Sequence, residues 1–240
     1  MYNSGDKKIP SKVKTIIISV AAVIAVVAAV IIIVCISGMS KPANSSITVY
    51  KTGGMMGVRI DNLETVVSDS TASGFKCDAE NGRVFYTVES SYSDVLYDLY
   101  YIEKKRSEIS APKIIDIGIS GDYSVVSGKL YYLKKNFSAG AFEGTVCNID
   151  NNEIKTFSGN VESIYALEKS DTVYFVKMHS SNRVLYKYEE DTASEICRDL
   201  MNIRCYNDGE NPHIFYEKKS QIHNGMTELY ILNSNGENEM

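Results

Sequence analysis

Histidine is the side chain most often used for metal binding and for proton transfer near neutral pH, and this sequence contains three. His179, His213 and His223 are well separated, and no His-x-x-x-His or Cys-x-x-Cys spacing occurs in the sequence. A zinc site needs ligands at such spacings, because they bring the donor atoms close together. We therefore predict no metal site, and we interpret His179 and His223 as solvated residues of a turn and a loop.

Four cysteines follow the N-terminal apolar segment: Cys77, Cys147, Cys197 and Cys205. In an oxidising compartment four cysteines can form two bridges in three connectivities. Their spacing matches no disulfide framework, so we favour small buried hydrophobic residues in strands. If one bridge forms, Cys197 and Cys205 are the best candidates.

Catalytic and ligand-binding motifs are incomplete in this sequence. A serine nucleophile elbow requires Gly-x-Ser-x-Gly, and the nearest string, Gly118–Gly121, lacks the second glycine at the required place. We interpret that string as a turn. The acidic stretches Asp150–Glu153 and Asn207–Glu210 resemble hairpin turns more than calcium loops. Gly53–Gly54 is followed by no helix pattern, which argues against a phosphate-binding loop.

Glycoside hydrolysis needs two carboxylates that flank a sugar. The sequence has no Trp to stack on a sugar, although its 17 Tyr could do so. No acidic pair stands out among so many acids. We therefore predict no catalytic residue and no cofactor, and we expect that the chain is not an enzyme.

Charge is unevenly distributed along the chain. The first 14 residues carry four Lys and one Asp, and the rest carries 21 basic and 29 acidic side chains. Nucleic-acid binding depends on clustered Lys and Arg, so an acidic chain with no basic cluster argues against such a partner.

One segment, Thr15–Ser37, contains 23 residues without a charge, Pro or Gly. At 1.5 Å per residue, a helix of this length crosses a hydrocarbon core of about 30 Å. A cleaved signal peptide remains an alternative, although its apolar core is usually about 7 to 15 residues. Cys35 lies too deep in the segment for a lipoprotein site. Because lysines precede the segment, the positive-inside rule predicts a cytoplasmic tail at 1–14 and an extracytoplasmic C-terminal side.

The segment 38–46 is small and polar and suits a short stalk. From 47 to 240 a motif recurs in which an apolar residue precedes two aromatic residues. The four copies are Val84-Phe85-Tyr86, Leu130-Tyr131-Tyr132, Val173-Tyr174-Phe175 and Ile214-Phe215-Tyr216. Their first aromatics are 46, 43 and 41 residues apart. Several short strands in a period of about 40–45 residues are typical of propeller blades.

Each period divides into strands that are separated by turn residues, and residues 47–68 look like the last three strands of a further blade. We expect adjacent aromatics to face opposite sides of a sheet and both to be buried between blades. The fold class predicted is an all-β, β-propeller-like array of about five four-stranded antiparallel blades. An irregular antiparallel sandwich is the alternative.

The strand that follows the aromatic pair has the form Leu-Tyr-x-hydrophobic, as in Val184–Tyr188 and Leu229–Gly236. These strands resemble bacterial membrane-anchored β-propellers of the YWTD-like and TolB-like kind, over residues 47–240. Such propellers usually close with more blades than this sequence provides. The resemblance implies a surface for recognition or scaffolding, and it transfers no catalytic residue.

The function expected is therefore a membrane-anchored, extracytoplasmic recognition or scaffolding module. Its partners would be a protein or a cell-envelope component, together with the lipid bilayer through the N-terminal helix. The alternative is an envelope enzyme or accessory module that binds or hydrolyses cell-wall glycan or peptide.

Overall fold

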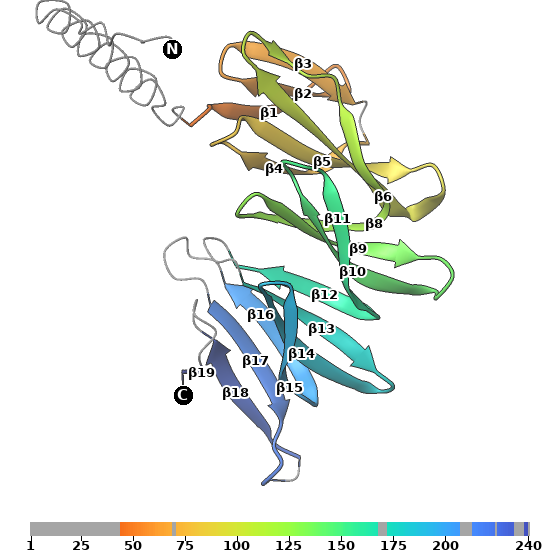
Figure 1. Ribbon diagram of the computed structural model, residues 1–240, viewed down its shortest axis with the longest axis vertical. Helices are drawn as coiled ribbons and strands as arrows, with labels where there is room; N and C mark the ends of the chain where they lie inside the picture. The colour runs from red at the N-terminus through yellow and green to blue at the C-terminus, as the bar shows by residue number, and fades with distance from the viewer. Residues whose placement is uncertain are drawn as a thin grey trace, which may run out of the picture. The chain divides into compact units, whose positions relative to one another are not determined.

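The computed structural model describes residues 44–68, 71–167, 172–206, 213–223, 225–232 and 238–239. The predicted tail, membrane segment and most of the predicted stalk lie outside these residues. Ser45 begins a compact unit in which every regular element within the described ranges is a strand (Figure 1). Among the described residues we find no helix that could span a membrane.

The strands form a succession of antiparallel sheets. The first sheet contains β1 (Ile47–Thr52), β2 (Met55–Ile60) and β3 (Leu63–Ser68). The second, eight-stranded sheet contains β4 (Ser73–Asp78), β5 (Arg83–Ser90), β6 (Ser93–Lys105), β7 (Glu108–Ile109), β8 (Lys113–Val126), β9 (Lys129–Asn136), β10 (Ala141–Asn148) and β11 (Glu153–Gly159). The third contains β12 (Val161–Ala166), β13 (Val173–His179), β14 (Asn182–Glu189) and β15 (Thr192–Cys197), and the fourth contains β16 (Leu200–Tyr206), β17 (His213–Lys219), β18 (Thr227–Leu232) and β19 (Asn238–Glu239).

Strand β8 joins two groups of strands that the sequence predicts as separate. Its first part pairs with β6, and its second part pairs with β9. We predicted a turn at Gly118–Gly121, and this was wrong because the chain bends there without leaving the sheet. Gly118 and Gly121 adopt φ values of 71° and 94°, which glycine tolerates best. A Cβ on Gly121 would also lie 2.7 Å from the Tyr97 ring.

We divide the described strands into five repeats on this basis. Repeat 1 is β1–β3, repeat 2 is β4–β6 with residues 113–119 of β8, repeat 3 is residues 122–126 of β8 with β9–β11, repeat 4 is β12–β15, and repeat 5 is β16–β19.

Each hydrophobic core cluster lies between two successive repeats. The prediction that both residues of an aromatic pair are buried is confirmed in repeats 2, 3 and 4. There the pairs are Phe85 and Tyr86, Tyr131 and Tyr132, and Tyr174 and Phe175, each at most 3% exposed. Side chains on alternate residues of a strand point to opposite faces, so one ring packs against the preceding repeat and one against the next.

Candidate functional site

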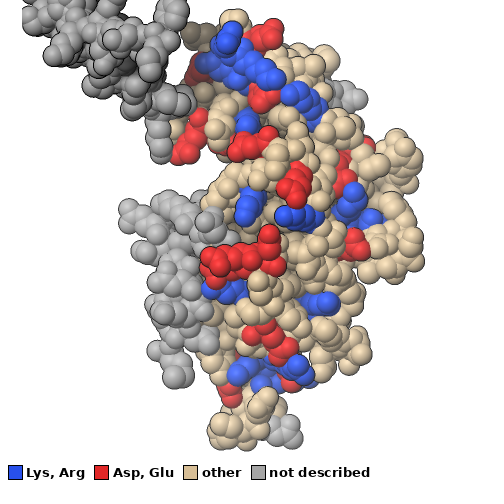
Figure 2. All heavy atoms as spheres, in the orientation of Figure 1, with Lys and Arg blue, Asp and Glu red and all other residues tan. Residues whose placement is uncertain are grey.

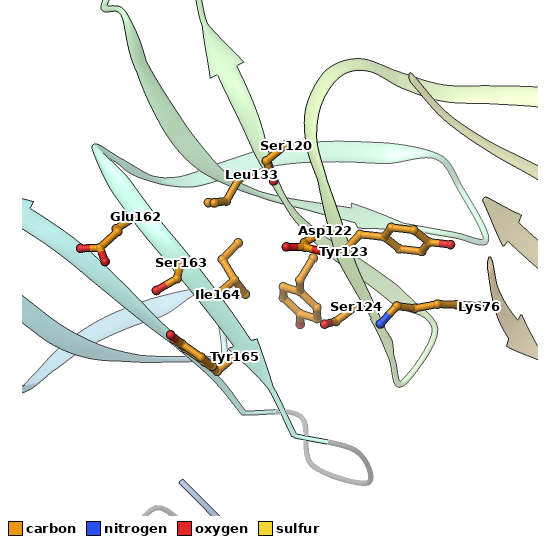
Figure 3. Close-up of a pocket in the computed structure, with 11 residues that line it drawn as sticks. Lys76, Ser120, Asp122, Tyr123, Ser124, Leu133, Glu162, Ser163, Ile164 and Tyr165 are labelled. Carbon is orange, nitrogen blue, oxygen red and sulfur yellow. The ribbon is translucent and has the colours of Figure 1, made fainter. Parts of the chain in front are cut away.

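A cavity of about 370 Å³ lies where the first strands of repeats 2, 3 and 4 approach one another (Figure 3). We call it the first-strand pocket. Its walls come from β4, β8, β9 and β12. The lining residues are Lys76, Ser120, Asp122, Tyr123, Ser124, Tyr131, Leu133, Glu162, Ser163, Ile164 and Tyr165.

Two opposite charges in this pocket have no ionic partner within the part of the chain that the structure describes. The Lys76 ammonium lies 5.5 Å from the centroid of the Tyr123 ring and forms no ion pair there. Asp122 is exposed and also forms none. By contrast, the third charged residue, Glu162, is held by Arg183 through bonds of 2.9 and 2.7 Å. Lys76 and Asp122 can therefore both form charge-assisted hydrogen bonds with a ligand.

Two hydroxyl groups that line the pocket are buried and find no hydrogen-bond partner among the described residues: Ser120 Oγ and Ser163 Oγ. Figure 3 shows the Ser120 hydroxyl directed into the cavity. A buried polar group without a partner lowers the stability of a fold, so most such groups in proteins are satisfied. A polar ligand in the pocket could satisfy one or both.

Tyr123 forms a fixed wall of the pocket. Its hydroxyl donates a 2.5 Å hydrogen bond to the carbonyl oxygen of Gly74 in β4. Burial, with a smaller effect of Cys77, raises the pKa of Tyr123 well above its usual range. The phenol therefore stays protonated near neutral pH, and its ring remains available to a cation or an apolar group.

None of the three histidines lines this pocket. His179 ends β13, where its Nε2 lies 3.0 Å from the Tyr186 hydroxyl, and it borders a small hollow with the paired Glu195 and Arg198. His213 begins β17 and His223 lies exposed between β17 and β18. Among the described residues, no three His, Cys, Asp or Glu side chains lie close enough together to hold a metal ion.

The cysteines form no disulfide bond in the described part of the chain, and the Cys197–Cys205 bridge that we considered is not present. Cys147 and Cys197 are buried as predicted, whereas Cys77 is exposed. Burial raises the pKa of the Cys147 and Cys197 thiols to about 11.

Comparison with known proteins rests on structure, since no protein-family model and no curated protein matches the sequence. The β-propeller domain of the Trilobed protease from Pyrococcus furiosus is similar, with a TM-score of 0.52, 10% identity, and coverage of 81% of this chain and 70% of that one. The chain has a β-propeller-like fold. Puromycin hydrolase also matches, with a TM-score of 0.51, 8% identity, and coverage of 77% of this chain and 32% of that chain. TolB from Acinetobacter baumannii matches with a TM-score of 0.47 and 11% identity. The match covers 86% of this chain and 55% of TolB.

These propeller structures correct one expectation from the sequence. We expected that the chain is not an enzyme. However, of the two similar structures with TM-scores above 0.5, one is a domain of a protease and the other is a hydrolase. The propeller-like fold therefore gives no ground for excluding catalysis. At 10% identity or less, the likeness shows a common fold and identifies no catalytic residue in this chain.

Proposed function

We propose that this chain is a membrane-anchored, extracytoplasmic recognition module with about five blades, whose first-strand pocket binds a polar segment of a partner protein. The observation that carries the proposal is the pair of uncommitted charges, Lys76 and Asp122, beside unsatisfied hydroxyl groups in one cavity. A peptide segment supplies both charges and backbone donors and acceptors, and aromatic walls at Tyr131 and Tyr165 can pack on its side chains.

Charge on the visible face agrees with a protein partner rather than a nucleic acid. Figure 2 shows Lys and Arg interspersed with Asp and Glu among the described residues of this face, without one continuous basic surface. Binding to a phosphate backbone requires such a surface. A mixed pattern of charge suits specific pairing with a protein of complementary pattern.

A photo-crosslinking amino acid placed at Tyr165 should capture the partner protein in cells. Tyr165 lines the pocket, whereas Tyr92 lies in a turn and is 76% exposed, so the same probe at Tyr92 serves as the control. We expect a crosslinked product at Tyr165 alone. Lys76→Glu should reduce its yield at least about tenfold, because a reversed charge repels a ligand group that the lysine attracted.

Equal crosslinking at both positions, or a yield that Lys76→Glu leaves unchanged, would contradict a role for the pocket.

A second candidate function is an envelope enzyme or accessory module that acts on peptide or glycan, and the protease and hydrolase among the similar structures favour it. Mass spectrometry of the product separates the two functions: a recognition module retains an intact partner, whereas an enzyme yields cleaved fragments.

Placement outside the cytoplasm can be tested with the native thiols. Cys77 is exposed and Cys205 is partly exposed, whereas Cys147 and Cys197 are buried, so a bulky thiol reagent should reach Cys77 most readily. A membrane-impermeant maleimide added to intact cells should therefore label the protein mainly at Cys77. The variant Cys77→Ser should lose most of this label. Labelling that occurs only after the membrane is permeabilised would place the domain inside the cell.

A further inference from the structure

The first aromatic residue of each pair packs against the following repeat. Phe85 shares a core cluster with Leu130 and Tyr132 of repeat 3, and Tyr131 shares one with Phe175 of repeat 4. In the same way, Tyr174 of repeat 4 packs with core residues of repeat 5. Phe215 of repeat 5 occupies the same position in its pair, yet within the described residues no further sheet covers it.

Among the described residues, the outer face of repeat 5 is an exposed sheet face with an apolar centre. We call it the terminal face, and it is formed by Arg204, Phe215, Glu217, Leu229 and Ile231. Phe215 pairs across the sheet with Arg204 and Ile231, and Glu217 pairs with Leu229, so these residues are neighbours. A hollow of about 280 Å³ lies among Asn202, Arg204, Phe215, Glu217 and Leu229, and Leu229 is 64% exposed.

The terminal face also carries two opposite charges, Arg204 and Glu217, with no ion pair in the described residues. The outer face of repeat 1 differs. There Arg59 forms an ion pair with Glu64, which also accepts a hydrogen bond from Tyr50. Arg59 and Glu64 of repeat 1 are thus paired within their own sheet, whereas Arg204 and Glu217 of repeat 5 are available to another molecule.

We propose that the terminal face is the interface between two copies of this chain that are related by a two-fold axis. In such an interface the same surface occurs on both sides, so it must be self-complementary. An axis that passes between Arg204 and Glu217 brings each arginine to the glutamate of the other copy, and Phe215 packs beside the axis. The apolar centre and the flanking opposite charges match this requirement.

Light scattering tests the proposal by measuring the mass of the full 240-residue chain in detergent over a range of concentrations. The measured mass is corrected for bound detergent. We expect a dimer for the natural sequence. Arg204→Glu and Glu217→Arg should each weaken the dimer at least about tenfold, because like charges then meet across the axis. The double variant should restore the dimer, since the reversed charges again pair.

Lys51→Glu is the matched control, because Lys51 is exposed on β1 and distant in sequence from repeat 5. It should leave the dimer unchanged. A monomer for the natural sequence would overturn the proposal, and so would a dimer that neither single reversal weakens. Weakening by both single reversals without restoration in the double variant would overturn the two-fold arrangement. Circular dichroism of each variant confirms that a loss of dimer is not a loss of fold.

Discussion

Phe85→Ala should lower the free energy of unfolding by about 3–5 kcal/mol, as is usual when a buried phenylalanine is removed from a core. The Phe85 ring is fully buried between repeats 2 and 3, and it stacks on Tyr101 with 6.1 Å between ring centroids. Truncation would remove these contacts and leave a cavity that both repeats line. Urea denaturation followed by circular dichroism measures the change.

Phe215→Ala is the matched control for Phe85→Ala, because Phe215 has the same place in its repeat but is only partly buried. In the monomer, Phe215→Ala should lower the free energy of unfolding by no more than about 1 kcal/mol, since a partly exposed ring loses fewer contacts on truncation. Equal costs at the two positions would contradict the conclusion that successive repeats share their cores.

Asp116→Ala should lower the free energy of unfolding by about 3 kcal/mol, in the range for removing one partner of a buried charged network. Asp116 is 8% exposed. Its carboxylate accepts hydrogen bonds from Lys134 Nζ at 2.6 Å and from the Tyr132 hydroxyl at 2.9 Å. Alanine would leave the buried Tyr132 hydroxyl without an acceptor, which carries its own desolvation cost.

Asp122→Ala, in the same strand, is the control for Asp116→Ala. Asp122 is exposed and has no ionic partner in the described residues, so its removal should change stability by no more than about 0.5 kcal/mol. Urea denaturation of both variants gives the comparison. A similar loss for both would mean that strand β8 tolerates neither change for reasons of backbone or packing, and that the Asp116 network contributes little.

The strand pattern could be predicted from the sequence because both faces of most sheets are buried. The pair Tyr174 and Phe175, for example, needs apolar partners on two sides, and only stacked sheets provide them. The continuity of β8 could not be predicted in this way. Gly118-Ile119-Ser120-Gly121 has the composition of a turn, and only the register with β6 and β9 shows that the chain bends within the sheet.

The first-strand pocket could not be predicted, because its residues come from strands between Lys76 and Tyr165 and share no local motif. Lys76 and Asp122 have the residue types of ordinary solvated positions. Ser120 was considered only as an incomplete nucleophile motif. What distinguishes these residues is their arrangement in space, and a single sequence contains no local signal for it.

The continuity of β8 also affects how the repeats would respond to a pulling force. Repeats 3 and 4 are joined by Asn160 between two separate sheets, so force there is resisted mainly by packing between side chains. Repeats 2 and 3 instead share one strand that pairs with β6 along its first part and with β9 along its second. Because Ile119 pairs with Tyr97 of β6 and also with Lys134 of β9, separating the two repeats at the bend would break backbone pairing there as well. Under load, this junction would therefore resist separation more than the junction of repeats 3 and 4, where no strand is shared.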